Sequence, residues 1–162
     1  MTPFRREGDE LLVDLSPTER VLLTRLATDL QELLRDAQGT ERRGENDPAV
    51  ARLLPDAYPD DAEASAEFRR FTESELLDGK IAQQRTIARL FGDEGGAPVV
   101  LTEPDALAFL RGLTDLRLVL AERLGIREDG DDGATDDEED FTANLYAWLG
   151  YLQGCLVDTL DG

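Results

Sequence analysis

Carboxylates are the most numerous side chains in this sequence that could take part in acid/base or metal chemistry. Its 162 residues include 36 aspartates and glutamates, a single cysteine (Cys155) and no histidine. Without histidine, the chain cannot form a Ser/His/Asp or Cys/His catalytic arrangement, nor a zinc site built on histidine and cysteine. The acids are so numerous that no spacing singles out a pair for acid/base catalysis. We therefore expect a protein that is not an enzyme, with no catalytic, cofactor-binding or metal-binding residues.

The densest group of carboxylates lies in residues 128–140, where nine of thirteen residues are acidic. An EF-hand calcium loop needs oxygen ligands at fixed positions and a glycine at its sixth position. If Gly133 is that glycine, Gly130 falls at the third position and offers no side-chain oxygen, so the pattern disfavours a specific calcium site. Because like charges at this density resist compaction, we predict a flexible acidic loop at about residues 127–137. Weak cation binding by this loop stays open.

Cys155 is the one residue with redox chemistry of its own. It falls one turn after Leu152, beside the apolar stripe of a predicted helix, and the nearest charged residue is Asp158. A reactive thiol needs cationic surroundings or a helix N-terminus, whereas a buried cysteine packs as a small hydrophobic residue. We favour a structural role for Cys155 and keep a redox role as the alternative.

Arg117 stands out because it lies between leucines in a strongly apolar helical segment. In one interpretation its aliphatic stem packs on the core while its guanidinium meets an acid such as Asp115 or Glu122 at the surface. In the other it forms a buried ion pair that fixes the register of the helix. The sequence does not decide between these two.

The charge balance limits the choice of partner. With 17 basic residues the formal net charge is −19, and such a field repels nucleic-acid phosphate and anionic membranes. Several basic residues gather in one predicted helical segment: Arg69, Arg70, Lys80, Arg85 and Arg89. Acids are interleaved with the first of them, which favours a solvated helix face with local ion pairs over a DNA-binding stripe.

Five helices are expected to carry these residues, because leucines and other apolar residues recur at helical spacing. Their predicted ranges are residues 17–37, 48–54, 61–92, 102–124 and 138–160. Ser16 and Glu19 form a capping-box pattern at the first start, and Gly125 suits the left-handed position after the fourth helix. Gly79 leaves open whether residues 61–92 form one helix or two.

A small β element completes the predicted fold. Residues 4–6 and 10–15 flank Glu7, Gly8 and Asp9, which indicates an antiparallel hairpin, and residues 99–101 are a candidate third strand. At this length, 41% hydrophobic content supports one core. We predict a mainly α-helical fold, with residues 1–162 as a single compact domain of about five helices and a hairpin or three-strand element.

Targeting signals are not evident. The first nine residues are charged and lack an apolar stretch, so we expect no signal peptide, and no apolar run approaches the ~20 residues of a membrane span. A single cysteine fits a reducing compartment. We expect a cytoplasmic protein without membrane contacts.

Three segments resemble an actinobacterial family. They are residues 105–126 (DALAFLRGLTDLRLVLAERLGI), residues 145–157 (LYAWLGYLQGCLV) and the helix start at residues 16–19 (SPTE). In their order, and in the length of the chain, they are similar to the DUF2017 proteins over nearly the whole chain. That family is named for having no assigned function, and its genes are often found near that of an adaptor for the Clp protease.

The resemblance also implies a link to stress. Some members of the family are described as oxidative-stress-responsive transcription regulators that sense through a cysteine pair. This chain departs from that pattern, because Cys155 alone cannot form an internal disulfide. A sulfenic acid or an intermolecular disulfide would remain available to it.

These observations favour a non-enzymatic cytoplasmic protein with an interaction or regulatory role, which binds a protein partner through an exposed helix face. The first alternative is a DNA-binding transcriptional regulator that responds to stress. The second is a carboxylate- or metal-dependent enzyme. Apolar stripes on the first and last helices suit either a core or a dimer seam, so a homodimer is possible. The identity of the partner and any link to the Clp protease stay open.

Overall fold

The computed structural model describes residues 2–38, 48–54, 62–92, 97–125 and 137–161. Five helices dominate it: α1 (Pro17–Gln38), α2 (Pro48–Leu53), α3 (Ala62–Phe91), α4 (Glu103–Leu124) and α5 (Asp137–Asp161). Three short strands accompany them: β1 (Phe4–Glu7), β2 (Glu10–Val13) and β3 (Val99–Leu101). The prediction of a mainly α fold with about five helices and a three-strand element is confirmed, with helix ends within two residues of those expected.

The strands form one antiparallel sheet in the order β1-β2-β3. Glu7 pairs with Glu10 across a two-residue turn in which Gly8 has a φ of 64°, a conformation that glycine adopts without strain. Strand β2 ends at Val13 rather than at residue 15, because the amide of Asp14 donates to the carbonyl of Pro3 (2.9 Å) and the chain then turns into α1. The predicted hairpin is therefore present in a slightly shorter form.

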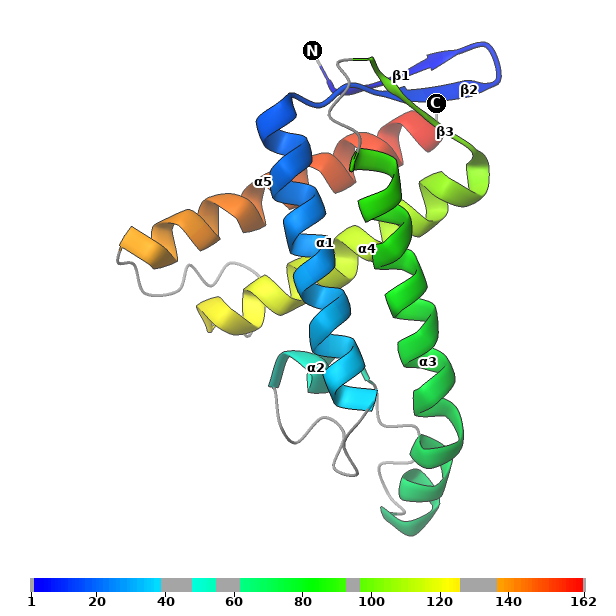
Figure 1. Ribbon diagram of the computed structural model, residues 1–162, viewed down its shortest axis with the longest axis vertical. Helices are drawn as coiled ribbons and strands as arrows, with labels where there is room; N and C mark the ends of the chain where they lie inside the picture. The colour runs from blue at the N-terminus through cyan, green and yellow to red at the C-terminus, as the bar shows by residue number, and fades with distance from the viewer. Residues whose placement is uncertain (1, 39–47, 55–61, 93–96, 126–136, 162) are drawn as a thin grey trace.

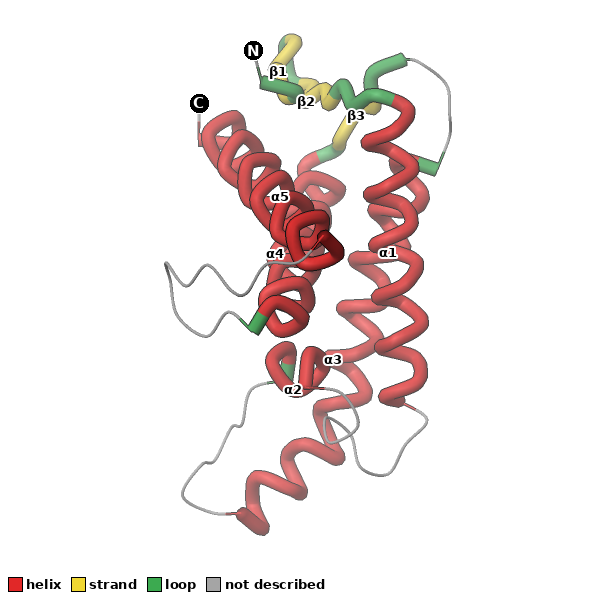
Figure 2. The backbone as a smooth tube through the Cα atoms, turned by 90° about the vertical axis from the view of Figure 1, so that its left-hand side faces the viewer, coloured by secondary structure: helices red, strands yellow, loops and turns green. Residues whose placement is uncertain are grey.

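Helix α4 lies at the centre of the helical layer. It packs against α3 on one side and α5 on the other, and α3 in turn packs against α1. Helix α2 packs across the C-terminal part of α4, where Arg52 forms an ion pair with Glu122 (3.2 Å). Figures 1 and 2 show the sheet covering one end of the helices, with both chain termini at that end. This arrangement brings β1 alongside the last turns of α5.

Local capping sets two of the helix starts. At α1, the amide of Ser16 donates to Glu19 Oε1 (2.9 Å) and the amide of Glu19 donates to Ser16 Oγ (3.2 Å), which is the predicted capping box. At α4, Thr102 Oγ1 accepts from the amide of Asp105 (3.1 Å). Gly125 follows α4 with a φ of 75°, the left-handed conformation expected there.

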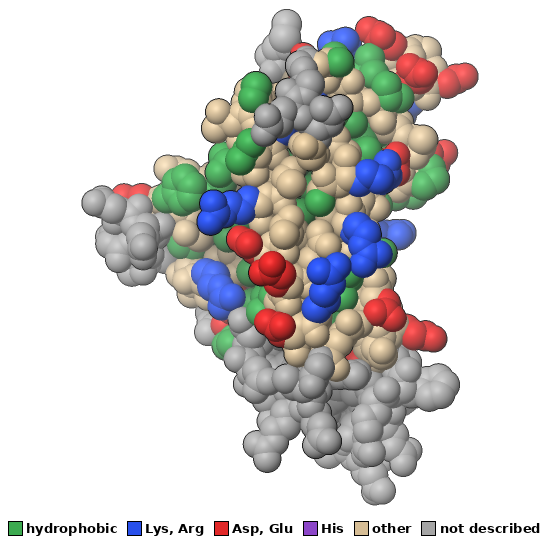
Figure 3. All heavy atoms as spheres, viewed as in Figure 1, with side chains coloured by type: hydrophobic (Ala, Val, Ile, Leu, Met, Phe, Trp, Pro, Cys, Tyr) green, Lys and Arg blue, Asp and Glu red, His purple; other side chains and the backbone are tan. Residues whose placement is uncertain are grey.

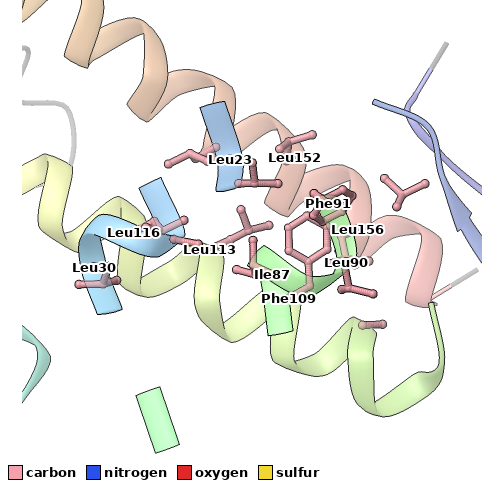
Figure 4. Close-up of a cluster of buried hydrophobic side chains, with 14 of the residues drawn as sticks. Leu23, Leu30, Ile87, Leu90, Phe91, Phe109, Leu113, Leu116, Leu152 and Leu156 are labelled. Atoms are coloured by element: carbon pink, nitrogen blue, oxygen red, sulfur yellow. The ribbon is translucent and has the colours of Figure 1, made fainter. Parts of the chain in front are cut away.

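The core lies where α1, α3, α4 and α5 meet beneath the sheet. Figure 4 shows leucines of α1 and α5 and the rings of Phe91 and Phe109 pointing into one shared space. The two ring centroids are 5.1 Å apart, and Phe4 of β1 adds a third ring 6.1 Å from Phe109. The hairpin is thus fastened to the helices by the aromatic residue that opens β1.

Two glycines occupy helices in opposite ways. Helix α3 runs unbroken through Gly79, so this glycine does not divide it, and a Cβ added there would meet nothing within 4 Å. A Cβ on Gly112 of α4 would lie 2.6 Å from Ile87 Cδ1 and 3.3 Å from Gln84 Nε2, both on α3. Gly112 therefore permits the close approach of α3 and α4.

Several sequence predictions fall outside the described residues. Residues 126–136, which hold nearly all of the predicted flexible acidic loop, are among them, and so is the calcium-loop comparison around Gly133. In the part of the chain that is described, no helix is long and apolar enough to cross a membrane.

The two glycines give a matched pair of stability predictions. We expect Gly112→Ala to lower the free energy of unfolding by roughly 1–2 kcal/mol, because overpacking costs about 1–3 kcal/mol and the helical propensity of alanine recovers up to about 1 kcal/mol. Gly79→Ala is expected to raise it by about 0.4–1 kcal/mol. Urea denaturation of both variants measures the difference. Equal effects of the two substitutions would show that α3 and α4 do not make the close contact.

Candidate functional site

Cys155 lies in the C-terminal half of α5 and is 9% exposed, with a free thiol. One helical turn earlier, Tyr151 is 50% exposed. A hydrogen bond to Cys155 raises the pKa of the Tyr151 phenol above its usual value of 10.0, and the negative charge of Glu19 adds to the increase. The buried thiol agrees with the packing role favoured from the sequence. Its hydrogen-bond partner Tyr151 is half-exposed, so the thiol contacts a group that reaches the protein surface.

Arg117 lies on α4 and points towards α5. Its guanidinium donates to Gln153 Oε1 (2.8 Å) and to the hydroxyl of Tyr146 (3.3 Å), and its Cζ lies 4.9 Å from the centroid of the Tyr146 ring. Gly150 leaves room for it, since a Cβ there would stand 3.4 Å from the guanidinium.

These contacts replace the acid partner that the sequence suggested for Arg117. Asp115 instead binds Lys80, and Glu122 binds Arg52, because both acids project from other sides of α4. Among the described residues, the partners of Arg117 are therefore neutral. The contacts still tie α4 to α5 at one register, which was the structural part of the second interpretation.

A hollow of about 560 Å³ opens where the start of the hairpin, the start of α1 and the middle of α5 meet. Its lining comprises Thr2, Pro3, Phe4, Arg5, Asp14, Glu19, Trp148, Tyr151 and Leu152. We call this space the aromatic hollow, because the half-exposed Tyr151 and the partly buried Trp148 form its α5 wall. Its volume is within the usual range of small-ligand and side-chain sites.

The charged groups of the aromatic hollow differ in whether an ion-pair partner already balances their charge. Arg5 Nε lies 3.2 Å from Glu7 Oε1, so its charge is balanced within β1. Glu19 Oε1 accepts the amide of Ser16, and among the described residues neither Glu19 nor Asp14 has an ion-pair partner. The hollow therefore combines the rings of Phe4, Trp148 and Tyr151 with two carboxylates that have no ion-pair partner among the described residues.

A second, smaller hollow of about 310 Å³ lies between the hairpin and the N-terminal turn of α4. Its one basic side chain, Arg6, donates to the carbonyls of Thr159 (3.0 Å) and Leu160 (3.3 Å). A cation at this position satisfies the last carbonyls of α5, where a helix carries a partial negative charge. Arg6 thus fastens the hairpin to α5, which makes this hollow the weaker candidate for a binding site.

Helices α3 and α4 enclose a buried polar strip that sequence reasoning missed. Lys80 Nζ lies 3.0 Å from Asp115 Oδ1 and 3.2 Å from Oδ2, and Gln84 Nε2 donates to the carbonyl of Gly112 (3.0 Å). Burial raises the pKa of Asp115 above its ordinary value of 3.8, and the attraction of Lys80 opposes that increase. Gln84 could have been found from its helical spacing, because it shares a face with Ile81.

Arg20 is a second buried polar residue that the sequence analysis did not single out. It is 4% exposed, its Nε donates to the carbonyl of Leu15 (3.2 Å), and a terminal nitrogen donates to the carbonyl of Ala97. It therefore joins the start of α1 to the segment before β3. The sequence could have indicated its burial, because Arg20 precedes Leu23 by three residues and Ala27 by seven, and both lie on the buried face of α1.

Two of the basic residues that were grouped in the sequence form ion pairs with acids of α4. Lys80 is paired with Asp115, and Arg89 is paired with Asp105 (3.0 Å), which agrees with the local ion pairs expected from the sequence. Figure 3 shows several basic side chains following one another down the right half of the face that α1 and α3 form, with acidic side chains on both sides of them. The described side chains include 12 of the 17 basic residues but 18 of the 36 acids, so the described part carries −6 of the total charge of −19.

Acidic residues do not assemble into a metal site within the described ranges, where no group of three or more His, Cys, Asp or Glu side chains is placed to hold an ion. The aromatic hollow is thus the arrangement best suited to binding. The sequence analysis identified Glu19 as a capping residue but none of the lining residues as a binding group.

The whole chain is similar to known proteins. Residues 1–160 match the sequence profile of a family described as a domain of unknown function, DUF2017. Proteins named "Oxidative stress regulator AosR" from Mycobacterium bovis and Mycobacterium tuberculosis are 31% identical to it over 186 residues, covering 97% of this chain and 85% of each relative. No solved structure matches the chain significantly. The resemblance stated from the helical segments is confirmed.

Burial of Cys155 predicts slow modification. We expect its thiol to react with Ellman's reagent at least about tenfold more slowly in the native chain than in the urea-unfolded chain. An opening free energy above about 1.4 kcal/mol produces a factor of this size. Cys155→Ser gives the background, because the chain has no other thiol. Equal native and unfolded rates would mean that the thiol is open to solvent, which would favour the redox interpretation.

The Asp115 carboxyl predicts a particular pH dependence. Between 3.8 and its raised folded-state pKa, the native chain retains a proton that the unfolded chain has released. The contribution of Asp115 to the free energy of unfolding must therefore fall as the pH rises through that window. Subtracting the unfolding free energy of Asp115→Asn from that of the wild type at each pH isolates this contribution. A difference that rises with pH would mean that the attraction of Lys80 outweighs burial.

Proposed function

The chain belongs to the DUF2017 family, and from that membership we propose that it is a regulatory protein of the oxidative stress response that acts by binding a protein partner. The support for regulation is the name of the mycobacterial relatives, oxidative stress regulator, which align with 97% of the chain. We place this activity in the cytoplasm and assign the chain no enzymatic reaction.

The aromatic hollow is the observation that carries the partner proposal. Large aromatic side chains are enriched in the energetic centres of protein interfaces, because they bury a large area at a low entropic cost. Tyr151 presents half of its surface to solvent at the edge of the hollow, beside the partly buried Trp148. Two carboxylates at the same place provide the charge that orients a partner during association.

The burial of Cys155, together with the lack of a second cysteine, limits where an oxidant could act on this chain. Cys155 is the only cysteine and is buried, so an internal disulfide is excluded and oxidation of this residue first requires opening of α5 or its surroundings. We therefore place the response to oxidants in the partner, or in the complex with it, rather than in a disulfide switch within the chain.

Affinity capture from native lysate tests the proposal. The full chain is used as bait with and without nuclease, partners are identified by mass spectrometry, and each is then tested for direct binding as a purified protein. We expect one stoichiometric partner whose capture survives nuclease. Tyr151→Ala should weaken its affinity by at least about tenfold, because truncating a residue at the centre of an interface costs about 2 kcal/mol.

Phe141→Ala is the matched control for that capture. Phe141 is also an aromatic residue of α5, is 57% exposed and lies outside the lining of the hollow. The proposal expects this variant to keep its partner. If capture collapses with nuclease, the chain is instead a DNA-binding regulator, and if both variants lose the partner equally, the hollow is not the docking site.

A further inference from the structure

We propose that the aromatic hollow receives an arginine side chain of the protein partner, with the guanidinium held between the rings of Trp148 and Tyr151 and the carboxylates of Asp14 and Glu19. This inference rests on the proposed function for its source of arginine, a protein surface. It goes further in naming the chemical group that the site recognises.

The two rings and two carboxylates are what a guanidinium requires. Aromatic faces attract a cation because of their quadrupole, and a planar guanidinium stacks on them while its N–H groups bind carboxylate oxygens. Asp14 and Glu19 lie at the same hollow without an ion-pair partner among the described residues, so a cation arriving there neutralises both. An anionic or purely apolar ligand would instead leave two desolvated carboxylates.

The basic residue already at the hollow does not fill this role. Arg5 is bound to Glu7, and both side chains are more than half exposed at 52% and 60%. Among the rings that the structure describes, only that of Tyr146 has a cation over it, the guanidinium of Arg117. No cation of the described residues therefore lies over the rings of Trp148 and Tyr151, and half of the surface of Tyr151 faces solvent.

Helix α5 already holds one arginine of this chain over an aromatic ring. One face of α5 holds Arg117 over Tyr146 with a hydrogen bond from the guanidinium to Gln153. The aromatic hollow repeats that combination of ring and polar acceptor on another part of the same helix, with carboxylates in place of an amide. The pKa of Tyr151 is raised mainly by its hydrogen bond to Cys155, and the negative charge of Glu19 makes a smaller contribution, which places that charge close to the ring.

The test uses two blocked tripeptides, acetyl-Gly-Arg-Gly-amide and the same peptide with citrulline, which has the shape of arginine but no charge. Trp148 is the only tryptophan of the chain, so its indole N–H signal in ¹H–¹⁵N NMR spectra reports on the hollow directly. We expect the arginine peptide to shift this signal in a saturable manner and the citrulline peptide to leave it unchanged. Equal responses, or none up to the solubility limit of the peptide, would overturn the inference.

Paired variants separate local recognition from the overall field. The double variant Asp14→Asn, Glu19→Gln removes both charges, and glutamine still suits the capping box, so α1 keeps its start. We expect it to weaken binding of the arginine peptide by roughly tenfold or more, since a hydrogen bond to a charged group is worth about 1.5–3 kcal/mol. Thermal unfolding confirms that it is folded.

The control is Asp29→Asn, Glu32→Gln, which removes two exposed charges further along α1. Ten or more residues of helix place them roughly 15 Å beyond Glu19, farther than the Debye length of about 8 Å at physiological salt. This variant should bind the arginine peptide as the wild type does. An equal loss in both double variants would show that only the long-range field attracts the peptide.

The capture experiment keeps this inference distinct from the proposed function. If a purified partner binds the wild type and the Asp14→Asn, Glu19→Gln variant equally, the regulatory function stands and the arginine site is refuted. If the arginine peptide binds the hollow but no protein partner survives nuclease, the recognition chemistry stands and the proposed function fails.

Discussion

The contact between α3 and α4 at Gly112 is the constraint on which the other helices depend. Because Gly112 has no Cβ, Ile87 and Gln84 of α3 reach the backbone of α4, and Gln84 binds the Gly112 carbonyl. Helix α4 is also the surface against which α2 and α5 pack. A shift of α4 relative to α3 would therefore move α5 and with it the aromatic wall of the hollow.

That contact is specific because it is partly polar. Asp115 is buried against Lys80, and Gln84 Oε1 has no partner among the described groups, so the interface carries desolvation that an apolar one would not. The Asp115 carboxylate and the Gln84 amide nitrogen find their partners in one alignment of the helices, whereas leucine contacts tolerate many alignments. Arg117 does the same between α4 and α5 with neutral partners. The two polar contacts together define the register of three helices.

The aromatic hollow results from this register. Asp14 and Glu19 come from the hairpin-to-helix junction, and Trp148 and Tyr151 come from the far end of the chain. Phe4 fastens the hairpin to Phe109, and Arg6 fastens it to the last carbonyls of α5, so the two walls are held independently of any ligand. A preformed site of this kind loses little freedom on binding, which suits the proposed recognition of a partner.

The sequence by itself determined the elements of this protein, because its signals for them are local. Apolar spacing gave five helices, the Ser16–Glu19 pattern gave the start of α1, and Gly8 gave the hairpin. Partners across helices depend on crossing angle and register, which no spacing within one segment encodes. Only the tertiary structure therefore decided that Arg117 meets Gln153 rather than an acid, that Asp115 takes Lys80, and that acids near residue 15 face the rings of α5.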